Sequence, residues 1–135
     1  GRRGVTPIRK LRDGGVNVSL STNNIRNPFT PFGNGDIMQV GFLAVPVAHL
    51  GGLSDLPTVL DMLTYNPAKA LRLSGYGLAV GDNADLVLLD TKKKNDAVID
   101  IPDRLYVIKN GRVTVQTEKK VSLYRRTEDI LASQR

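Results

Sequence analysis

The chain has 135 residues, enough for one domain with a single core but far short of the ~250 residues of a complete (β/α)8 barrel. Apolar residues make up 41% and charged residues 24%, which excludes a chain that is disordered throughout. Cysteine is absent, which excludes a disulfide framework and a thiolate metal site, and the net charge is +6.

The basic residues gather in three clusters, Lys92–Lys94, Lys119–Lys120 and Arg125–Arg126. No aromatic residue is interleaved with the lysines, and each cluster falls in a predicted loop or tail, so we expect a solvated surface and no nucleic-acid partner. No segment approaches the ~18 uninterrupted apolar residues that span a bilayer, and no signal-like amino terminus is present. We therefore expect no membrane partner and a cytoplasmic location.

The first elements are a short helix, a strand and a long loop. Thr6 and Pro7 predict the helix start, because a threonine hydroxyl caps free amides and proline fits the first turn. Gly14-Gly15 ends that helix. Apolar and polar residues then alternate over Val16–Ser21, which predicts a strand. Prolines and glycines exclude regular structure from Thr22–Gly35.

Three helices are expected next. Asp36 is a plausible cap for the first, and we expect a break at Pro46, where proline removes one backbone hydrogen bond. Ser54 and Pro57 open the second. Asn66-Pro67 caps and starts a short third helix that runs through Leu71.

The pattern then changes to strands. Leu86–Leu89 is a continuous apolar strand. Leu105–Ile108 is expected to pair with Val113–Val115, because Asn110-Gly111 between two apolar runs is the sequence typical of a type I′ hairpin turn. The polar end of the chain suggests a frayed helix over Glu128–Ala132.

Three segments resemble the metal-dependent amidohydrolases. YNPAKAL at 65–71 and GLAVGDNADLVLLD at 77–90 are similar to the end of that superfamily, and VNVSLSTNNIRNPFTPFG at 16–33 resembles its cytosine deaminase-like branch. The likeness runs from Arg2 to about Leu123. It implies an α/β chain in which residues 1–75 form the last elements of a (β/α)8 barrel, including strand eight. Residues 76–135 would then form part of a small β-sandwich with a tail.

The resemblance also implies a site. The family uses a divalent metal, zinc or iron, and an aspartate at the end of strand eight that accepts a proton from water. Asn23 stands at that position, and an amide cannot shuttle a proton. The alternative is an ordinary turn residue, but the register of strand, loop and downstream motif favours the site. Asn24 and Phe29 match positions that contact a flat heterocycle; loop anchoring in the core is the alternative for Phe29 and the preferred interpretation for Phe32.

Other chemistries lack support. His49 is the one histidine and has no second ligand at helical spacing, so we interpret it as a helix-end residue and expect no metal in this chain alone. The aspartates include no pair spaced for glycosidase chemistry. The serines lack the G-x-S-x-G pattern of serine hydrolases, and the glycines fit no phosphate-binding pattern.

Two functions follow. The first is the carboxyl-terminal part of a cytosine deaminase-like amidohydrolase that hydrolyses a C–N bond of a pyrimidine-like or triazine-like ring, inactive alone, with the missing amino-terminal barrel portion as its partner. The second is a non-enzymatic remnant that pairs with a second copy of itself or with another protein. The start at Gly1 fits an expression remnant or a cut from a longer chain, and the abrupt onset of the resemblance favours the cut.

Overall fold

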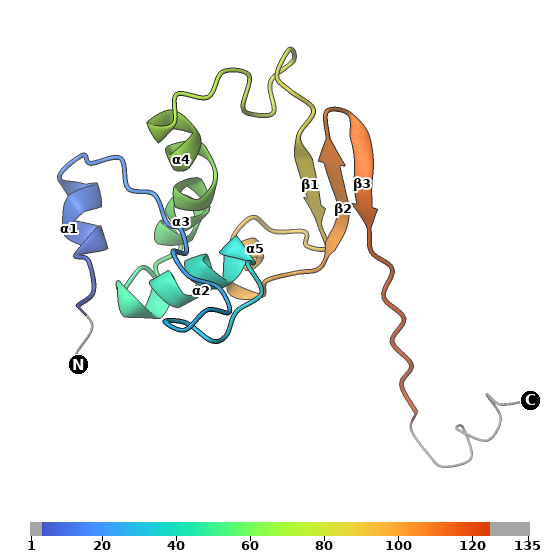
Figure 1. Ribbon diagram of the computed structural model, residues 1–135, viewed down its shortest axis with the longest axis horizontal. Helices are drawn as coiled ribbons and strands as arrows, with labels where there is room; N and C mark the ends of the chain where they lie inside the picture. The colour runs from blue at the N-terminus through green and yellow to red at the C-terminus, as the bar shows by residue number, and fades with distance from the viewer. Residues whose placement is uncertain (1–3, 125–135) are drawn as a thin grey trace, which may run out of the picture.

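The computed structural model describes residues 4–124, which form five helices and a three-stranded sheet (Figure 1). In chain order the elements are α1 (Ile8–Asp13), α2 (Ile37–Val47), α3 (Asp55–Leu63), α4 (Tyr65–Ala70), β1 (Leu86–Leu89), α5 (Asp96–Ile99), β2 (Arg104–Lys109) and β3 (Arg112–Gln116). The larger helices gather on one side of the molecule, and the sheet stands beside them (Figure 1). The expected helix over Glu128–Ala132 lies outside the described residues. None of the described helices is long and apolar enough to cross a membrane.

The core lies where α2, α3 and α5 pack together. Its fully buried side chains are Leu50, Val59, Met62 and Val98. Gly41 allows α2 to approach α3 closely, because a Cβ at this position would lie 2.6 Å from Leu63 Cδ1. The sequence did not predict α5, yet this short helix between β1 and β2 returns the chain to the helical core through Val98.

Helix α2 begins as expected and ends slightly later than expected. The carboxylate of Asp36 accepts a hydrogen bond from Met38 N at 2.9 Å, which confirms Asp36 as its amino-terminal cap. The helix continues through Pro46 and ends at Val47, so the expected break falls one residue later. His49 follows with a positive φ of 55°, which confirms it as a residue at a helix end.

The start of α1 and the segment after it correct two expectations. Pro7 is the residue before the helix and Thr6 makes no capping hydrogen bond with its side chain, so the cap prediction was wrong. Residues 16–21 belong to no sheet within the described part of the chain. A strand needs a neighbouring backbone, and here Leu20 N instead donates to Met62 O at the end of α3, at 2.9 Å.

Asn66 holds this segment in place and does not cap α4. The helix starts one residue earlier, at Tyr65, so that Asn66 and Pro67 lie inside its first turn. Asn66 Nδ2 donates to Val18 O at 2.8 Å, and Asn17 Nδ2 donates to Asn66 O at 2.9 Å. We call this reciprocal pair of hydrogen bonds the asparagine clamp. It joins two segments 48 residues apart in the sequence.

The sheet confirms the predicted strands and hairpin. Its order is β1-β2-β3, antiparallel throughout, with Val87 opposite Val107 and Val107 opposite Val115. Asn110 and Gly111 form the turn between β2 and β3 with φ of 50° and 73°, the positive values that a type I′ turn requires.

Apolar side chains on this sheet are exposed. Val87 and Leu88 are neighbours on β1 and therefore point to opposite faces, yet both are more than half exposed. Val113 and Val115 on β3 are exposed to a similar degree. Within residues 4–124, neither face of the sheet is fully covered.

Two acidic side chains tie the parts of the molecule together. Asp36 forms an ion pair with Arg104, which joins the start of α2 to β2. Asp55 is the buried charged residue of the described chain, and Arg12 Nη1 lies 2.6 Å from its Oδ1. Arg9 Nη2 lies 3.1 Å from Asp55 Oδ2. The hydrogen bond from Arg12 lowers the pKa of Asp55 below its ordinary value, and a bond from Gly52 N acts in the same direction.

The asparagine clamp should contribute measurably to stability. We expect Asn66→Ala to lower the free energy of unfolding by about 1 kcal/mol, because the half-buried Val18 carbonyl loses its donor. Urea denaturation followed by circular dichroism measures the change. Asn83→Ala is the matched control, since the Asn83 side chain is exposed and makes no side-chain hydrogen bond within residues 4–124. Equal effects of the two substitutions would contradict the clamp.

The Asp55 ion pairs should make stability depend on pH. The folded pKa of Asp55 lies below its unfolded value, so its carboxylate stabilises the fold above the unfolded pKa, and the effect is lost as pH falls through the folded pKa. We expect Asp55→Asn to lower the urea midpoint at neutral pH and the gap from the parent to shrink below about pH 4. Asp61→Asn, which removes a more exposed ion pair with Lys94, should change little. A gap that is the same at every pH would contradict this assignment.

Candidate active site

The segment fixed by the asparagine clamp leads directly to the residues that the sequence singled out. Asn23 is exposed and lies at a bend immediately after this segment. Asn24 follows and is half-buried. Thr22 Oγ1 donates to Asn24 O at 3.1 Å, which closes the bend around Asn23. The amide of Asn23 offers one carbonyl oxygen and two N–H donors, and it has no group that can take up a proton at neutral pH.

The loop beyond this bend is held by its own hydrogen bonds, and Asn27 is their centre. Asn27 Nδ2 donates to Asn24 Oδ1 at 2.6 Å. Asn27 Oδ1 accepts from Phe29 N and Thr30 N, each at 3.0 Å. The backbones of Asn27 and Thr30 also pair with each other in both directions. The side chain of Asn27 therefore connects Asn24 to the tip of the loop.

A second set of bonds closes the base of the loop. Arg26 N donates to Phe32 O at 3.3 Å, and Arg26 Nε donates to Gly33 O at 2.9 Å. Asn34 Oδ1 accepts from Asp36 N at 3.0 Å, which leads the loop into α2. The loop thus has a defined shape although it contains no helix or strand.

Both aromatic side chains of the loop are on the surface. Phe29 is 75% exposed and Phe32 is 72% exposed. The expectation that Phe32 anchors the loop in the core was wrong, because the backbone bonds around Asn27 and Arg26 hold the loop without a buried anchor. Phe29 lies at the tip of the loop, where its own backbone N–H and that of Thr30 donate to Asn27 Oδ1, and its side chain is likewise outside the core.

The described residues do not make a metal site by themselves. No three His, Cys, Asp or Glu side chains within residues 4–124 come together closely enough to hold an ion. His49 lies at the carboxyl end of α2, where its carbonyl accepts a hydrogen bond from Arg9. The carboxylates of Asp36, Asp55 and Asp85 are each engaged by a basic side chain. The donor set of this part of the chain therefore does not fit a divalent cation.

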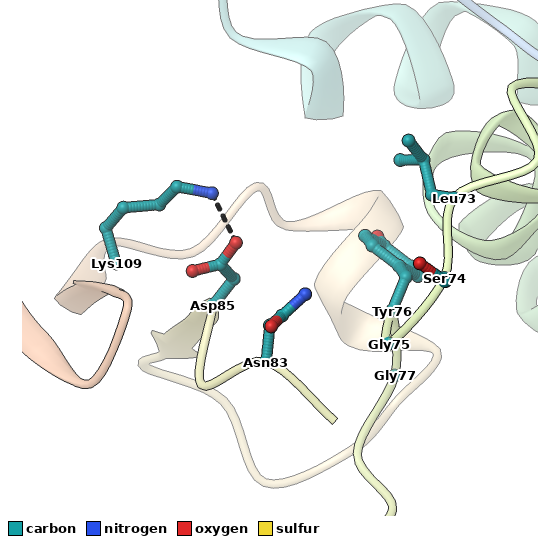
Figure 2. Close-up of a pocket in the computed structure, with 8 residues that line it drawn as sticks. All are labelled: Leu73, Ser74, Gly75, Tyr76, Gly77, Asn83, Asp85 and Lys109. Carbon is teal, nitrogen blue, oxygen red and sulfur yellow. Dashed lines mark hydrogen bonds and ion pairs between the residues drawn. The ribbon is translucent and has the colours of Figure 1, made fainter. Parts of the chain in front are cut away.

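A cavity of about 230 Å³ lies elsewhere, between the chain after α4 and the β2–β3 hairpin (Figure 2). Asp85 and Lys109 form an ion pair on one side of it, with Tyr76 and Asn83 nearby. Asp85 also accepts a bond from Asn110 N at 2.8 Å, and the Lys109 ammonium lowers the pKa of its carboxyl. Asn23, Asn24 and Phe29 do not line this cavity. We interpret the cavity as part of the connection between the sheet and the helices.

The residues that orient the candidate site were not predicted from the sequence. Asn17, Asn27 and Asn66 were not identified as positioning residues. The role of Asn27 could have been predicted from its neighbour Pro28. Asn followed by Pro favours turns in which the asparagine side chain bonds the backbone amide two residues further on. No local sequence pattern predicts the bond between Asn17 and Asn66, because the two residues are 49 positions apart.

Comparison with known proteins identifies the family to which this chain belongs. A family model described as "Amidohydrolase family" matches residues 1–115. The N-isopropylammelide isopropyl amidohydrolase of Pseudomonas sp. strain ADP is 39% identical over 113 residues, which are 83% of this chain and 28% of that protein.

Solved structures give the same result. The 5-methylcytosine deaminase of Klebsiella pneumoniae, liganded with phosphonocytosine, superposes with a TM-score of 0.85 at 36% identity, covering 91% of this chain and 30% of that one. The N-isopropylammelide isopropylaminohydrolase of Burkholderia multivorans superposes with a TM-score of 0.76 at 27% identity, over 83% of this chain and 29% of that one. This chain, which spans less than a third of the length of these relatives, belongs to the amidohydrolase family and resembles its cytosine deaminase-like members.

Proposed function

We propose that this chain supplies the carboxyl-terminal part of a cytosine deaminase-like amidohydrolase, which hydrolyses a C–N bond of a pyrimidine-like or triazine-like ring. The observation that carries the proposal is the clamped segment 16–22, which opens at Asn23 and Asn24 onto a loop with an exposed aromatic at its tip. By name, one relative is an N-isopropylammelide isopropyl amidohydrolase, and another is a 5-methylcytosine deaminase whose structure holds phosphonocytosine. Under this proposal residues 1–75 complete a barrel and residues 76–135 contribute to a sandwich.

Two side chains would contact the substrate. Asn24 is half-buried beside the bend and offers an amide to a ring edge. Phe29 would place its ring on the face of a flat heterocycle, a contact worth roughly 0.5–1.5 kcal/mol beyond the area it buries. The exposure of Phe29 in this chain suits that role, because a binding aromatic cannot also be buried in the core.

The divalent metal of the family, zinc or iron, would be held largely by residues outside this chain, since the described donor set does not fit it. When bound, such a metal supplies water that ionises near neutral pH. Asn23 occupies the position of the acidic residue that would accept the proton, and its amide cannot do so. The amino-terminal barrel portion is therefore the partner that we propose.

The second candidate function is a non-enzymatic module that associates with a copy of itself or with another protein. The exposed apolar side chains on both faces of the sheet favour it, as do the outer backbone edges of β1 and β3, which pair with no other strand in residues 4–124. Such edges pair readily with another chain.

Restoring the carboxylate at position 23 tests the first function. We expect a chimera, in which this chain replaces the matching part of the Klebsiella 5-methylcytosine deaminase, to deaminate cytosine slowly. Asn23→Asp should raise its turnover by about 10²–10⁴-fold, the effect of a positioned general base. Ammonia release measures the rate. Asn24→Asp is the matched control and should not restore turnover; equal rates for the parent and Asn23→Asp would contradict the assignment of position 23.

The exposed sheet predicts self-association of the 135-residue chain. We expect dimers or larger species in sedimentation velocity at micromolar concentration, because paired copies would cover Val87 and Val115. Val115→Lys should weaken association, whereas Val80→Lys, in the exposed turn before β1, should not. A parent chain that sediments as a monomer would contradict this prediction.

A further inference from the structure

We propose that Asn27 is a positioning residue that holds the side-chain amide of Asn24 with its NH2 group toward the ligand. The site would then take a planar ring that presents a carbonyl oxygen at the edge facing Asn24. The inference rests on the proposed function, because it takes Asn24 as a ligand contact.

The side-chain amide of Asn27 has one allowed orientation. Its Oδ1 lies 3.0 Å from Phe29 N and 3.0 Å from Thr30 N, and both backbone groups are donors. Turning the amide over would place its NH2 group against two N–H groups, which leaves three donors and no acceptor between them. The oxygen of Asn27 must therefore face the loop tip, and its nitrogen must face the other way.

The orientation of the Asn27 amide fixes that of the Asn24 amide. Asn27 Nδ2 lies 2.6 Å from the side chain of Asn24, and an amide nitrogen has only hydrogens to offer. The atom of Asn24 that it meets must be Oδ1. Asn24 Nδ2 is then directed away from Asn27, and within residues 4–124 it donates to no protein group.

The consequence is chemical selectivity. Asn24 is a half-buried residue, and its NH2 group without a protein acceptor in residues 4–124 favours a ligand atom that accepts a hydrogen bond. A ligand with an exocyclic amino group at the same edge would place one hydrogen-bond donor against another, the NH2 group of Asn24. An aspartate at position 24 would offer acceptors only and would reverse this preference.

One substitution should reverse the orientation of Asn24 without changing its identity. Asn27→Asp keeps an oxygen for the amides of Phe29 and Thr30 but replaces Nδ2 by a second oxygen, which repels Asn24 Oδ1. The Asn24 amide should then turn over and present its carbonyl oxygen to the ligand. Asn34→Asp is the matched control: it adds the same charge in the same loop and keeps the oxygen that accepts from Asp36 N.

The orientation is measured on the 135-residue chain by hydrogen exchange of side-chain amides in ¹H–¹⁵N spectra. We expect one Asn27 side-chain proton to exchange about fivefold more slowly than either Asn24 proton, the factor that corresponds to a net hydrogen bond of ~1 kcal/mol. In Asn27→Asp an Asn24 proton should become the slow one, and Asn34→Asp should match the parent. A slow Asn24 proton in the parent, or equal exchange at both residues, would overturn the proposal.

The ligand preference is measured on the chimera carrying Asn23→Asp, by calorimetric Kd and by KM and kcat. Cytosine and 2,4-diaminopyrimidine form the probe pair, since an amino group replaces the C2 carbonyl oxygen of cytosine in the second ring, and N1 changes from an N–H group to an unprotonated nitrogen. We expect cytosine to have the lower Kd by about tenfold, Asn27→Asp to narrow or reverse that ratio through KM more than kcat, and Asn34→Asp to preserve it.

The two measurements separate the possible failures. An unchanged ratio in Asn27→Asp overturns the inference even if the chimera deaminates cytosine, which leaves the proposed function intact. If the chimera binds neither ring while the Asn27 proton is protected in the 135-residue chain, the amide orientation is supported. The ligand assignment and the proposed function are then both overturned.

Discussion

The asparagine clamp is the constraint on which the candidate site depends. Residues 16–21 have no neighbouring strand within the described part of the chain, so no sheet fixes their direction. Their position rests on the bonds between Asn66 and Val18 and between Asn17 and Asn66, together with Leu20 N on Met62 O. Since Asn23 and Asn24 follow this segment directly, the clamp sets where both amides stand.

The loop beyond the clamp shows how a site can be defined without a buried anchor. Its shape comes from one asparagine that bonds the loop tip and Asn24 together, and from Arg26 at its base. The aromatic side chains are thereby left on the surface. These exposed aromatic side chains are available to contact a ligand or another protein surface.

Much of the fold could be predicted from local sequence. The apolar run at Leu86–Leu89, the Asn110-Gly111 turn and the Asp36 cap each depend on a few neighbouring residues, and the structure confirms all three. The family resemblance, carried by the motifs at 65–71 and 77–90, is confirmed as well. The motif residue Asn66 was nevertheless misinterpreted as a cap, because its true partner is Val18.

Much of what could not be predicted depends on contacts between residues that are far apart in the sequence. Asp55 bonds Arg12, which is 43 residues away in the sequence, and Asp36 bonds Arg104, which is 68 residues away. No local sequence pattern predicts either pair. Helix α5 has four residues and forms because Ala97 and Val98 fill a space between α2 and α3. Phe32 was placed in the core from its apolar character alone, while the loop's own hydrogen bonds decide its position.

Under the proposed function, Asn23 and Asn24 stand at a heterocycle-binding site. A crystal structure of the chimera with 5-fluorocytosine tests it most directly, because the ring's position is then seen without reference to turnover. We expect Asn24 Nδ2 to lie about 3 Å from an acceptor atom of the ring, with Phe29 against the ring and Asn23 beside the carbon that bears the amino group. A ring bound with no contact to Asn23, Asn24 or Phe29 would contradict it.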